Sequence, residues 1–195
     1  MISVTEAGED LLISGAYILT TGTIISAIGQ TVRHDTGKRL FTIGNAVEAF
    51  GNLLQASGWI QKLELKRNEA EILSLIGCLI QAAGNTTNSV ASEIELQTNE
   101  EEGIPLNALG SGIQSVGAAF EATGAYEEGR NLEVTGNSLL AIGALLDSAG
   151  NFITLHQDHT KGEFVQMLGG WVQVAGASID LYSISVVDRY KDKSQ

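Results

Sequence analysis

The sequence predicts an all-α protein, built as an antiparallel up-and-down bundle of about six helices. Three observations lead to this prediction. Glycine recurs at every seventh residue within blocks about one helix long, and such a block recurs six times along the chain. Residues that favour helix are abundant, and Pro105 is the one proline in 195 residues. Short charged stretches between the blocks suit turns that join antiparallel neighbours.

The first three helices are predicted at residues 10–32, 39–59 and 68–92. The first has no charged residue from 11 to 32. In the second, the unit TIGNAVEAFGNLLQASG places three glycines seven residues apart. The third keeps this spacing with two glycines, and the small residue Ala91 occupies the third place.

The other three helices are predicted at residues 105–126, 132–155 and 162–188. The first two carry complete glycine triplets, and the last has two glycines with Ser183 in the third place. Charged connectors are expected around residues 33–40, 60–71, 93–106, 126–134 and 156–164. The six helices would form a single domain, residues 1–195, with both termini at the same end of the bundle.

The glycines at the first two places of each block are predicted to be helix-packing residues. A glycine inside a helix costs about 0.5–1 kcal/mol relative to alanine, so another interaction must offset the cost. Close approach of two backbones is the available mechanism, because glycine removes the side chain that holds helix axes apart. The predicted packing residues are Gly15, Gly22, Gly44, Gly51, Gly77, Gly84, Gly110, Gly117, Gly136, Gly143, Gly169 and Gly176. At the third place, Gly29, Gly58 and Gly124 could instead be C-terminal caps.

The positions around the glycines indicate which face of each helix is buried. The residue three after a glycine is large and apolar in nearly every block, as at Ile18 and Leu54, and we expect it to face the core. A strand would alternate with period two and could not keep such a column on one face. The residues one and five after each glycine are mostly small and uncharged, which is unusual for a surface in water.

The residue four after a glycine is mostly polar and includes every charge found inside the blocks. These charges are Glu48, Glu121, Asp147 and Asp180. They could be interpreted as a catalytic set, but their positions on separate helices need not bring them together. We expect a partly exposed polar stripe at the helix–helix borders, which sets register through hydrogen bonds.

Charge and cysteine content exclude several functions and suggest a compartment. The net charge of −12 opposes binding to nucleic acids and to anionic lipid headgroups. The single cysteine, Cys78, excludes an internal disulfide and suits a reducing compartment. Glu6, Glu9 and Asp10 stand where a signal peptide would carry basic residues. We therefore predict a cytoplasmic localisation.

No catalytic residue, cofactor or metal site is predicted. His156 and His159, near Glu163, could share a metal on one helical turn, but we expect this polar stretch to be a solvated loop. Cys78 has apolar neighbours and is expected to pack rather than to react. The GSG at residues 110–112 lacks both the third glycine and the preceding strand of a dinucleotide-binding fingerprint.

Residues 11–32 are long enough to cross a bilayer, with acidic residues before them and basic residues after them. The threonines and serines within this segment, and the acidic residues in the other helices, oppose insertion. Contact with a membrane is therefore possible but not favoured by the sequence.

The six-fold glycine layout resembles a family of repetitive, glycine-rich helical proteins of unknown function from Bacillus-type bacteria. Its clearest units are TIGNAVEAFGNLLQASG and VTGNSLLAIGALLDSAGN, and the resemblance covers residues 11–187. No activity is attached to that family, so the resemblance implies no catalytic residue.

We predict a non-enzymatic structural or protein-interaction bundle. Its faces of small residues would form either tight internal seams or a surface for self-association, so the expected partner is a second copy or another protein. The alternative is a membrane-active bundle that inserts or forms a pore. A third possibility is an enzyme whose site the sequence does not reveal.

Overall fold

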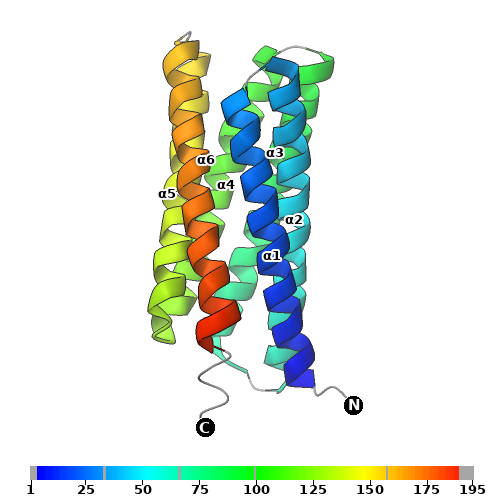
Figure 1. The fold of residues 1–195 in the computed structure, drawn as a ribbon, viewed down its shortest axis with the longest axis vertical. Helices are drawn as coiled ribbons and strands as arrows, with labels where there is room; N and C mark the ends of the chain where they lie inside the picture. Colours follow the sequence, from blue (N-terminus) through cyan, green and yellow to red (C-terminus); the bar gives the residue numbers. More distant parts are fainter. Residues whose placement is uncertain (1–3, 33, 66, 99, 157, 189–195) are drawn as a thin grey trace.

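The structure is a computed structural model that describes residues 4–32, 34–65, 67–98, 100–156 and 158–188. These residues form six long helices and a closing π-helical turn, and no strand occurs among them (Figure 1). The elements are α1 (Val4–Val32), α2 (His34–Leu65), α3 (Glu69–Gln97), α4 (Glu100–Glu127), α5 (Asn131–Leu155), α6 (His159–Tyr182) and the π-helix η1 (Ser183–Asp188). The prediction of an all-α bundle of six helices is confirmed.

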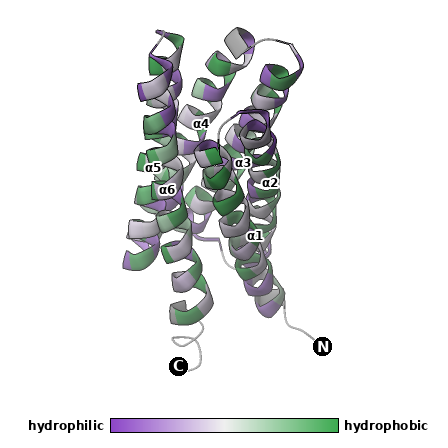
Figure 2. Cartoon of the chain, turned by 45° about the horizontal axis from the view of Figure 1, so that its top comes forward, coloured by the Kyte–Doolittle hydropathy of each residue, from purple (hydrophilic) through white to green (hydrophobic). Residues whose placement is uncertain are grey.

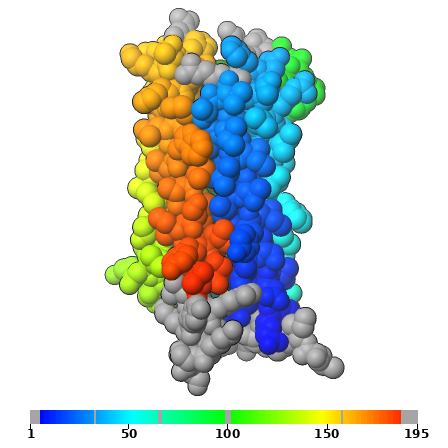
Figure 3. All heavy atoms as spheres, in the orientation of Figure 1, coloured from blue at the N-terminus to red at the C-terminus, as the bar shows by residue number. Residues whose placement is uncertain are grey.

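The six helices form a ring of antiparallel neighbours. The most extensive contacts join α1 to α2, α3 to α4 and α5 to α6, and these three pairs meet through α2 with α3 and α4 with α5. Contacts between α1 and α6 close the ring, and these two helices pack side by side in Figure 3. The described ends of the chain therefore lie at the same end of the bundle (Figure 1). We call this end of the bundle the terminal end. The opposite end, which we call the hairpin end, holds the α1–α2, α3–α4 and α5–α6 turns.

The first five helices are longer than predicted, mainly because charged residues assigned to connectors continue the helices. The last helix, predicted at residues 162–188, is instead α6 from His159 to Tyr182, and residues 183–188 form the π-helix η1. α2 covers His34–Leu65 rather than residues 39–59, and α4 begins at Glu100 rather than at residue 105. The turns are correspondingly short. Asn68 caps α3 by accepting a hydrogen bond from the Ala70 backbone nitrogen at 3.1 Å. Gly129, with φ of 69°, lies in the turn into α5.

Each helix pair is held at close range by glycines that face one another. A Cβ atom placed on Gly15 would lie 2.7 Å from the carbonyl oxygen of Gly51, and one placed on Gly51 would lie 2.8 Å from that of Gly15. No real Cβ atom sits so close to a backbone oxygen, so the contact requires glycine on both sides. The twelve predicted packing residues form six such reciprocal pairs, Gly15 with Gly51, Gly22 with Gly44, Gly77 with Gly117, Gly84 with Gly110, Gly136 with Gly176 and Gly143 with Gly169.

The interpretation of Gly29, Gly58 and Gly124 as C-terminal caps is wrong. Each of their helices continues beyond the glycine. A Cβ atom on Gly29 would lie 2.6 Å from the Gly37 carbonyl oxygen, and one on Gly58 would lie 2.7 Å from that of Gly8. The third glycine of these blocks therefore serves the same close approach as the first two.

The predicted assignment of buried and exposed faces is also wrong. All twelve residues of the polar column, four after each glycine, are buried. The large apolar residues three after each glycine are only half-buried. Further large apolar residues are exposed on the outer surface of the bundle, including Phe50 at 55% and Leu145 at 60% exposure.

The interior of the ring is small and polar instead of large and apolar. The largest fully buried side chains include Asn45, Asn52, Asn85 and Asn88. Apolar residues form two small buried clusters, one of which contains Leu12, Ala56, Trp59 and Cys78. In Figure 2, hydrophobic residues recur along the middle of the helices and hydrophilic residues are frequent at their ends. The bundle thus inverts the usual arrangement of a protein that folds in water.

Candidate functional site

Polar side chains from five helices meet at the centre of the ring. Gln114 of α4 donates hydrogen bonds to the side-chain oxygens of Asn45 in α2, at 3.1 Å, and of Asn85 in α3. This network exists because glycine and other small residues bring the helices close enough for short amide side chains to reach across.

A second part of the network is centred on Asp147 of α5. Asn88 donates a hydrogen bond to Ser111 at 3.0 Å, and Ser111 donates one to Asp147 at 3.2 Å. Gln30 of α1 donates to the other carboxylate oxygen of Asp147 at 2.7 Å. The side chain of Asp147 is 2% exposed and forms no ion pair with any residue that the structure describes.

The other three acidic residues of the blocks are also buried, so the partly exposed stripe predicted for them does not exist. Glu48 accepts a hydrogen bond from Ser26 at 2.6 Å, and Glu121 accepts one from Gln81 at 2.6 Å. Asp180 accepts one from Asn137 at 3.2 Å. Glu48 and Asp147 line the same small internal space of about 10 Å³, enough for about one water molecule. The ring order brings these two acids together, which separate helices alone could not guarantee.

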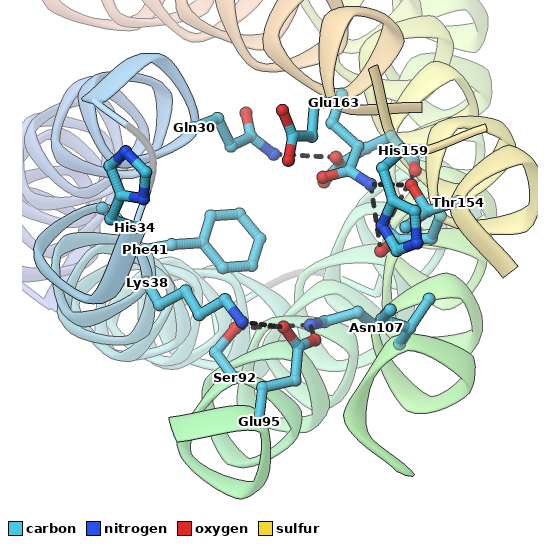
Figure 4. A pocket seen from close by; sticks show the side chains of 16 residues that line it. Gln30, His34, Lys38, Phe41, Ser92, Glu95, Asn107, Thr154, His159 and Glu163 are labelled. Carbon is cyan, nitrogen blue, oxygen red and sulfur yellow. Dashed lines mark hydrogen bonds and ion pairs between the residues drawn. The ribbon is translucent and has the colours of Figure 1, made fainter. Parts of the chain in front are cut away.

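A larger cavity of about 130 Å³ opens at the hairpin end of the bundle (Figure 4). All six helices contribute to its wall. Its lining includes Gln30 of α1, Phe41 of α2, Glu95 of α3, Asn107 of α4 and Asp147 of α5, together with Glu163 of α6. Gln30, Phe41 and Asp147 also line the small space that holds Glu48, so the two spaces adjoin.

The polar groups on one side of the cavity are paired with one another. Lys38 forms an ion pair with Glu95 at 3.4 Å, and Asn107 donates hydrogen bonds to Glu95 at 2.5 Å and to Ser92 at 3.4 Å. The amide oxygens of Gln30 and Asn107 are buried and have no hydrogen-bond partner among the described residues. These two oxygens are therefore unsatisfied acceptors that lie beneath the surface of the wall, whereas the amide nitrogens of the same side chains are engaged.

The histidines of the predicted loop lie near this cavity but are not brought together as a metal site. His156 follows the end of α5 and is exposed, and His159 begins α6, is exposed and lines the cavity. Among the residues with described positions, no three His, Cys, Asp or Glu side chains are placed to hold a metal ion. Asp158 caps α6, and its hydrogen bonds with Lys161 lower the pKa of its carboxyl group and raise the pKa of the lysine.

Cys78 is fully buried in the cluster with Trp59, and its thiol lies beside the carboxyl group of Glu121. We expect a thiol reagent such as DTNB to label the folded protein roughly 100-fold more slowly than the unfolded protein. The reason is that labelling requires an opening that costs a few kcal/mol. Absorbance at 412 nm follows the reaction, and the same protein in denaturant is the control. Labelling at the same rate in both states would show that this part of the interior is open.

Sequence reasoning missed Gln30, Lys38, Glu95 and Asn107, all of which line the cavity. Each lies outside the two glycine positions and their polar column, near a helix end. One signal in the sequence pointed to a polar interior, namely the arc of small uncharged residues beside the glycines. Of the two interpretations of that arc, internal seams or a surface for self-association, burial of these residues within the ring supports the first.

Comparison with known proteins gives one match. The model of a family of unknown function (DUF6944) matches residues 10–181. A search of the curated proteins and a search of the solved structures found no match. Residues 10–181 include most of the ring, so the cavity described above falls within the matched region.

Proposed function

Because the chain belongs to this family of unknown function (DUF6944), which supplies no activity, we propose a role from its geometry. The protein is a membrane-embedded helical bundle with a polar interior, and its role is non-enzymatic. The observation that carries this proposal is that, among the described residues, no charged side chain lies on the outer surface of the ring between its two ends.

This surface, which we call the outer belt, consists of the exposed and half-buried side chains of one segment per helix. The segments are residues 11–32, 40–61, 72–92, 103–126, 134–155 and 164–182. Their only charged residues are Glu48, Glu121, Asp147 and Asp180, and all four are buried inside the ring. At 1.5 Å per residue, a segment of about 20 residues is roughly 30 Å long, which is close to the thickness of a bilayer's hydrocarbon core.

The chemistry of the belt suits lipid better than water. Large apolar side chains are exposed on every helix of the belt, among them Phe50, Leu79, Leu109 and Leu145. Apolar patches of this extent are rare on monomers in water. Tyr126 and Tyr182 lie at the last residues of their belt segments, where aromatic side chains favour a membrane interface.

The interior meets the requirements of a membrane bundle. Helices satisfy their own backbone hydrogen bonds, and the glycine pairs allow the close packing that holds membrane helices together. The acidic residues that opposed insertion in the sequence are buried inside the ring, where polar residues of membrane proteins are found.

Hydropathy averaged over a whole helix understates how apolar its outward-facing residues are. Two helical stretches, Glu6–Val32 and Asn131–Leu155, are long and apolar enough to cross a membrane by length and composition. The other helices have lower averages because amide residues such as Gln81 and Gln114 face the interior and count equally with the outer residues.

A second candidate is the structural or interaction bundle expected from the sequence, in which the belt is covered by further copies of the chain. Ser14, Thr21, Thr135 and Ser178 favour it, because these exposed hydroxyl residues interrupt the apolar surface. Such residues are more common where proteins meet than where a helix faces lipid. The cytoplasmic localisation inferred from charge and Cys78 stays a prediction, and it is compatible with this second candidate only.

Cell fractionation tests the proposal. We expect the full chain to sediment with membranes, to stay there through a carbonate wash at pH 11, and to be released as a monodisperse species by a mild detergent. A soluble monomer would contradict both candidates. A soluble oligomer whose mass depends on concentration would reject the membrane proposal and support the self-associating bundle.

A further inference from the structure

We propose that the interior of the ring passes protons across the membrane, along buried carboxyl groups that lie in two pairs within the bundle. This inference rests on the membrane location proposed above and adds an activity to it. Ionisable residues are rare within membrane helices, and where they occur they commonly mark proton relays or ion pathways. The six belt segments contain four acidic residues and no Lys, Arg or His.

The first pair, Glu48 and Asp147, lies towards the hairpin end. The two side chains line one internal space of about 10 Å³, enough for about one water molecule. Hydroxyl and amide side chains, Phe41 and Gly170 complete its lining, and none of the described residues that line it is basic. The cavity of about 130 Å³ reaches Asp147 from the hairpin end. Water in that cavity can therefore deliver a proton to this pair.

The second pair, Glu121 and Asp180, lies towards the terminal end. The two carboxyl groups interact electrostatically with each other, and Glu121 also interacts with the thiol of Cys78 and with Arg130, which precedes α5. Arg130 in turn forms an ion pair with the exposed Glu128 at 2.8 Å. The second pair is therefore close to the solvent at the opposite end of the bundle from the first.

Asn52 lies between the two pairs. It follows Glu48 by one turn of α2 and precedes Trp59 by two turns, and Trp59 packs against Cys78, beside Glu121. Asn52 is 0% exposed, and neither polar atom of its side chain has a hydrogen-bond partner among the described residues. Buried amides are almost always hydrogen-bonded, in many cases to an internal water molecule. A water molecule held by Asn52 would link the two pairs.

The dimensions of this pathway suit protons better than metal ions. Asp147 and Asn137, which binds Asp180, are ten residues apart in α5, or roughly 15 Å. A proton crosses such a distance in short steps. In each step a carboxylic acid gives its proton to a water molecule and regains one from the other side, so only O–H bonds break and form. A calcium ion would need six to eight oxygen ligands, and no metal-binding cluster of His, Cys, Asp or Glu occurs among the described residues.

Phosphatidylcholine vesicles that contain the purified full chain and trapped pyranine test the inference. A potassium gradient with valinomycin makes the inside negative, and pyranine fluorescence reports acidification of the lumen. We expect the rate of acidification to rise in proportion to the protein that resists a carbonate wash of the vesicles. A chain that does not enter the vesicles would reject the membrane proposal and this inference with it. Incorporated protein without proton flux would reject this inference alone, and equally fast sodium uptake would overturn the choice of proton.

One variant in each pair and two controls locate the pathway. Asp147→Asn and Glu121→Gln replace a carboxyl group by an amide, which does not take up and release protons near neutral pH, so each should slow the flux at least about tenfold. Each variant tests the pathway by itself if the other fails to fold. Asp147→Glu keeps a carboxyl group and should retain most of the flux. Glu93→Gln neutralises an exposed acid of α3 outside both pairs and should leave the flux unchanged. Wild-type flux in both amide variants would contradict the pathway.

Discussion

Replacing Gly117 with alanine is expected to destabilise the bundle by about 1–2 kcal/mol. The new Cβ atom would lie 2.7 Å from the backbone nitrogen of Gln81 and 2.8 Å from the carbonyl oxygen of Gly77. Both atoms belong to the backbone of α3 and cannot rotate away, so α3 and α4 must move apart. Overpacking of this kind typically costs 1–3 kcal/mol, and the better helix propensity of alanine returns less than about 1 kcal/mol.

Gly112→Ala provides a matched control in the same helix. A Cβ atom at this position would meet only the Ser148 hydroxyl oxygen, at 3.7 Å, which is an ordinary contact. Alanine should therefore stabilise the protein by about 0.5–1 kcal/mol through helix propensity alone. Equilibrium unfolding of both variants, followed by circular dichroism in denaturant, measures the difference. Equal stability of the two variants would mean that α3 and α4 are not held together by backbone contact.

Replacing Val116 with arginine is expected to disfavour membrane insertion by about 2.5–3.5 kcal/mol, the cost of arginine at the centre of a membrane helix. Val116 is 52% exposed on the outer belt, one residue before Gly117, and its side chain points away from the ring. In a chain that folds in water, the same change would alter stability by less than about 0.5 kcal/mol, because exposed substitutions are usually neutral there. The effect of this substitution therefore differs sharply between the two environments.

Tyr126→Arg is the matched control. Tyr126 is 73% exposed on the same helix, at the last residue of its belt segment and next to Glu127. Arginine at the edge of a membrane can extend its charged group into water, so little loss is expected. The amount of each variant that resists a carbonate wash, compared with the wild type, is the measurement. Full membrane retention of Val116→Arg would count against a lipid-facing belt, as would equal losses in the two variants.

The number of helices and their approximate positions could be predicted from the sequence. Seven-residue spacing keeps glycines such as Gly44, Gly51 and Gly58 on one face only if the backbone is helical. The ends of the helices were less predictable. Charged residues such as Lys62 and Glu95 were assigned to connectors, but they continue α2 and α3 and form ion pairs with neighbouring helices.

The identity of the buried face could not be predicted by the rule that apolar residues face inward. That rule assumes water around the protein, and it placed Ile18 and Leu54 in the core and Glu48 at the border. Each helix has one face of large apolar residues and one face of small and polar residues, and periodicity alone does not say which face is directed to the interior. The face of small and polar residues is buried because only glycine, alanine, serine and short amide residues fit between backbones that are this close.

The sequence by itself determined that the protein is helical and that the glycines available for close contacts recur every seven residues. It also determined that charged residues occur only near the helix ends and at the position four residues after a glycine. These properties depend on local propensity and on spacing along one helix. Only the tertiary structure decided which glycine meets which, that Asp147 lies beside Glu48, and that Gln30 and Asn107 share one cavity. Such contacts join residues far apart in the chain, and they follow from the order of six antiparallel helices around a ring. The spacing within a single helix carries no information about that order.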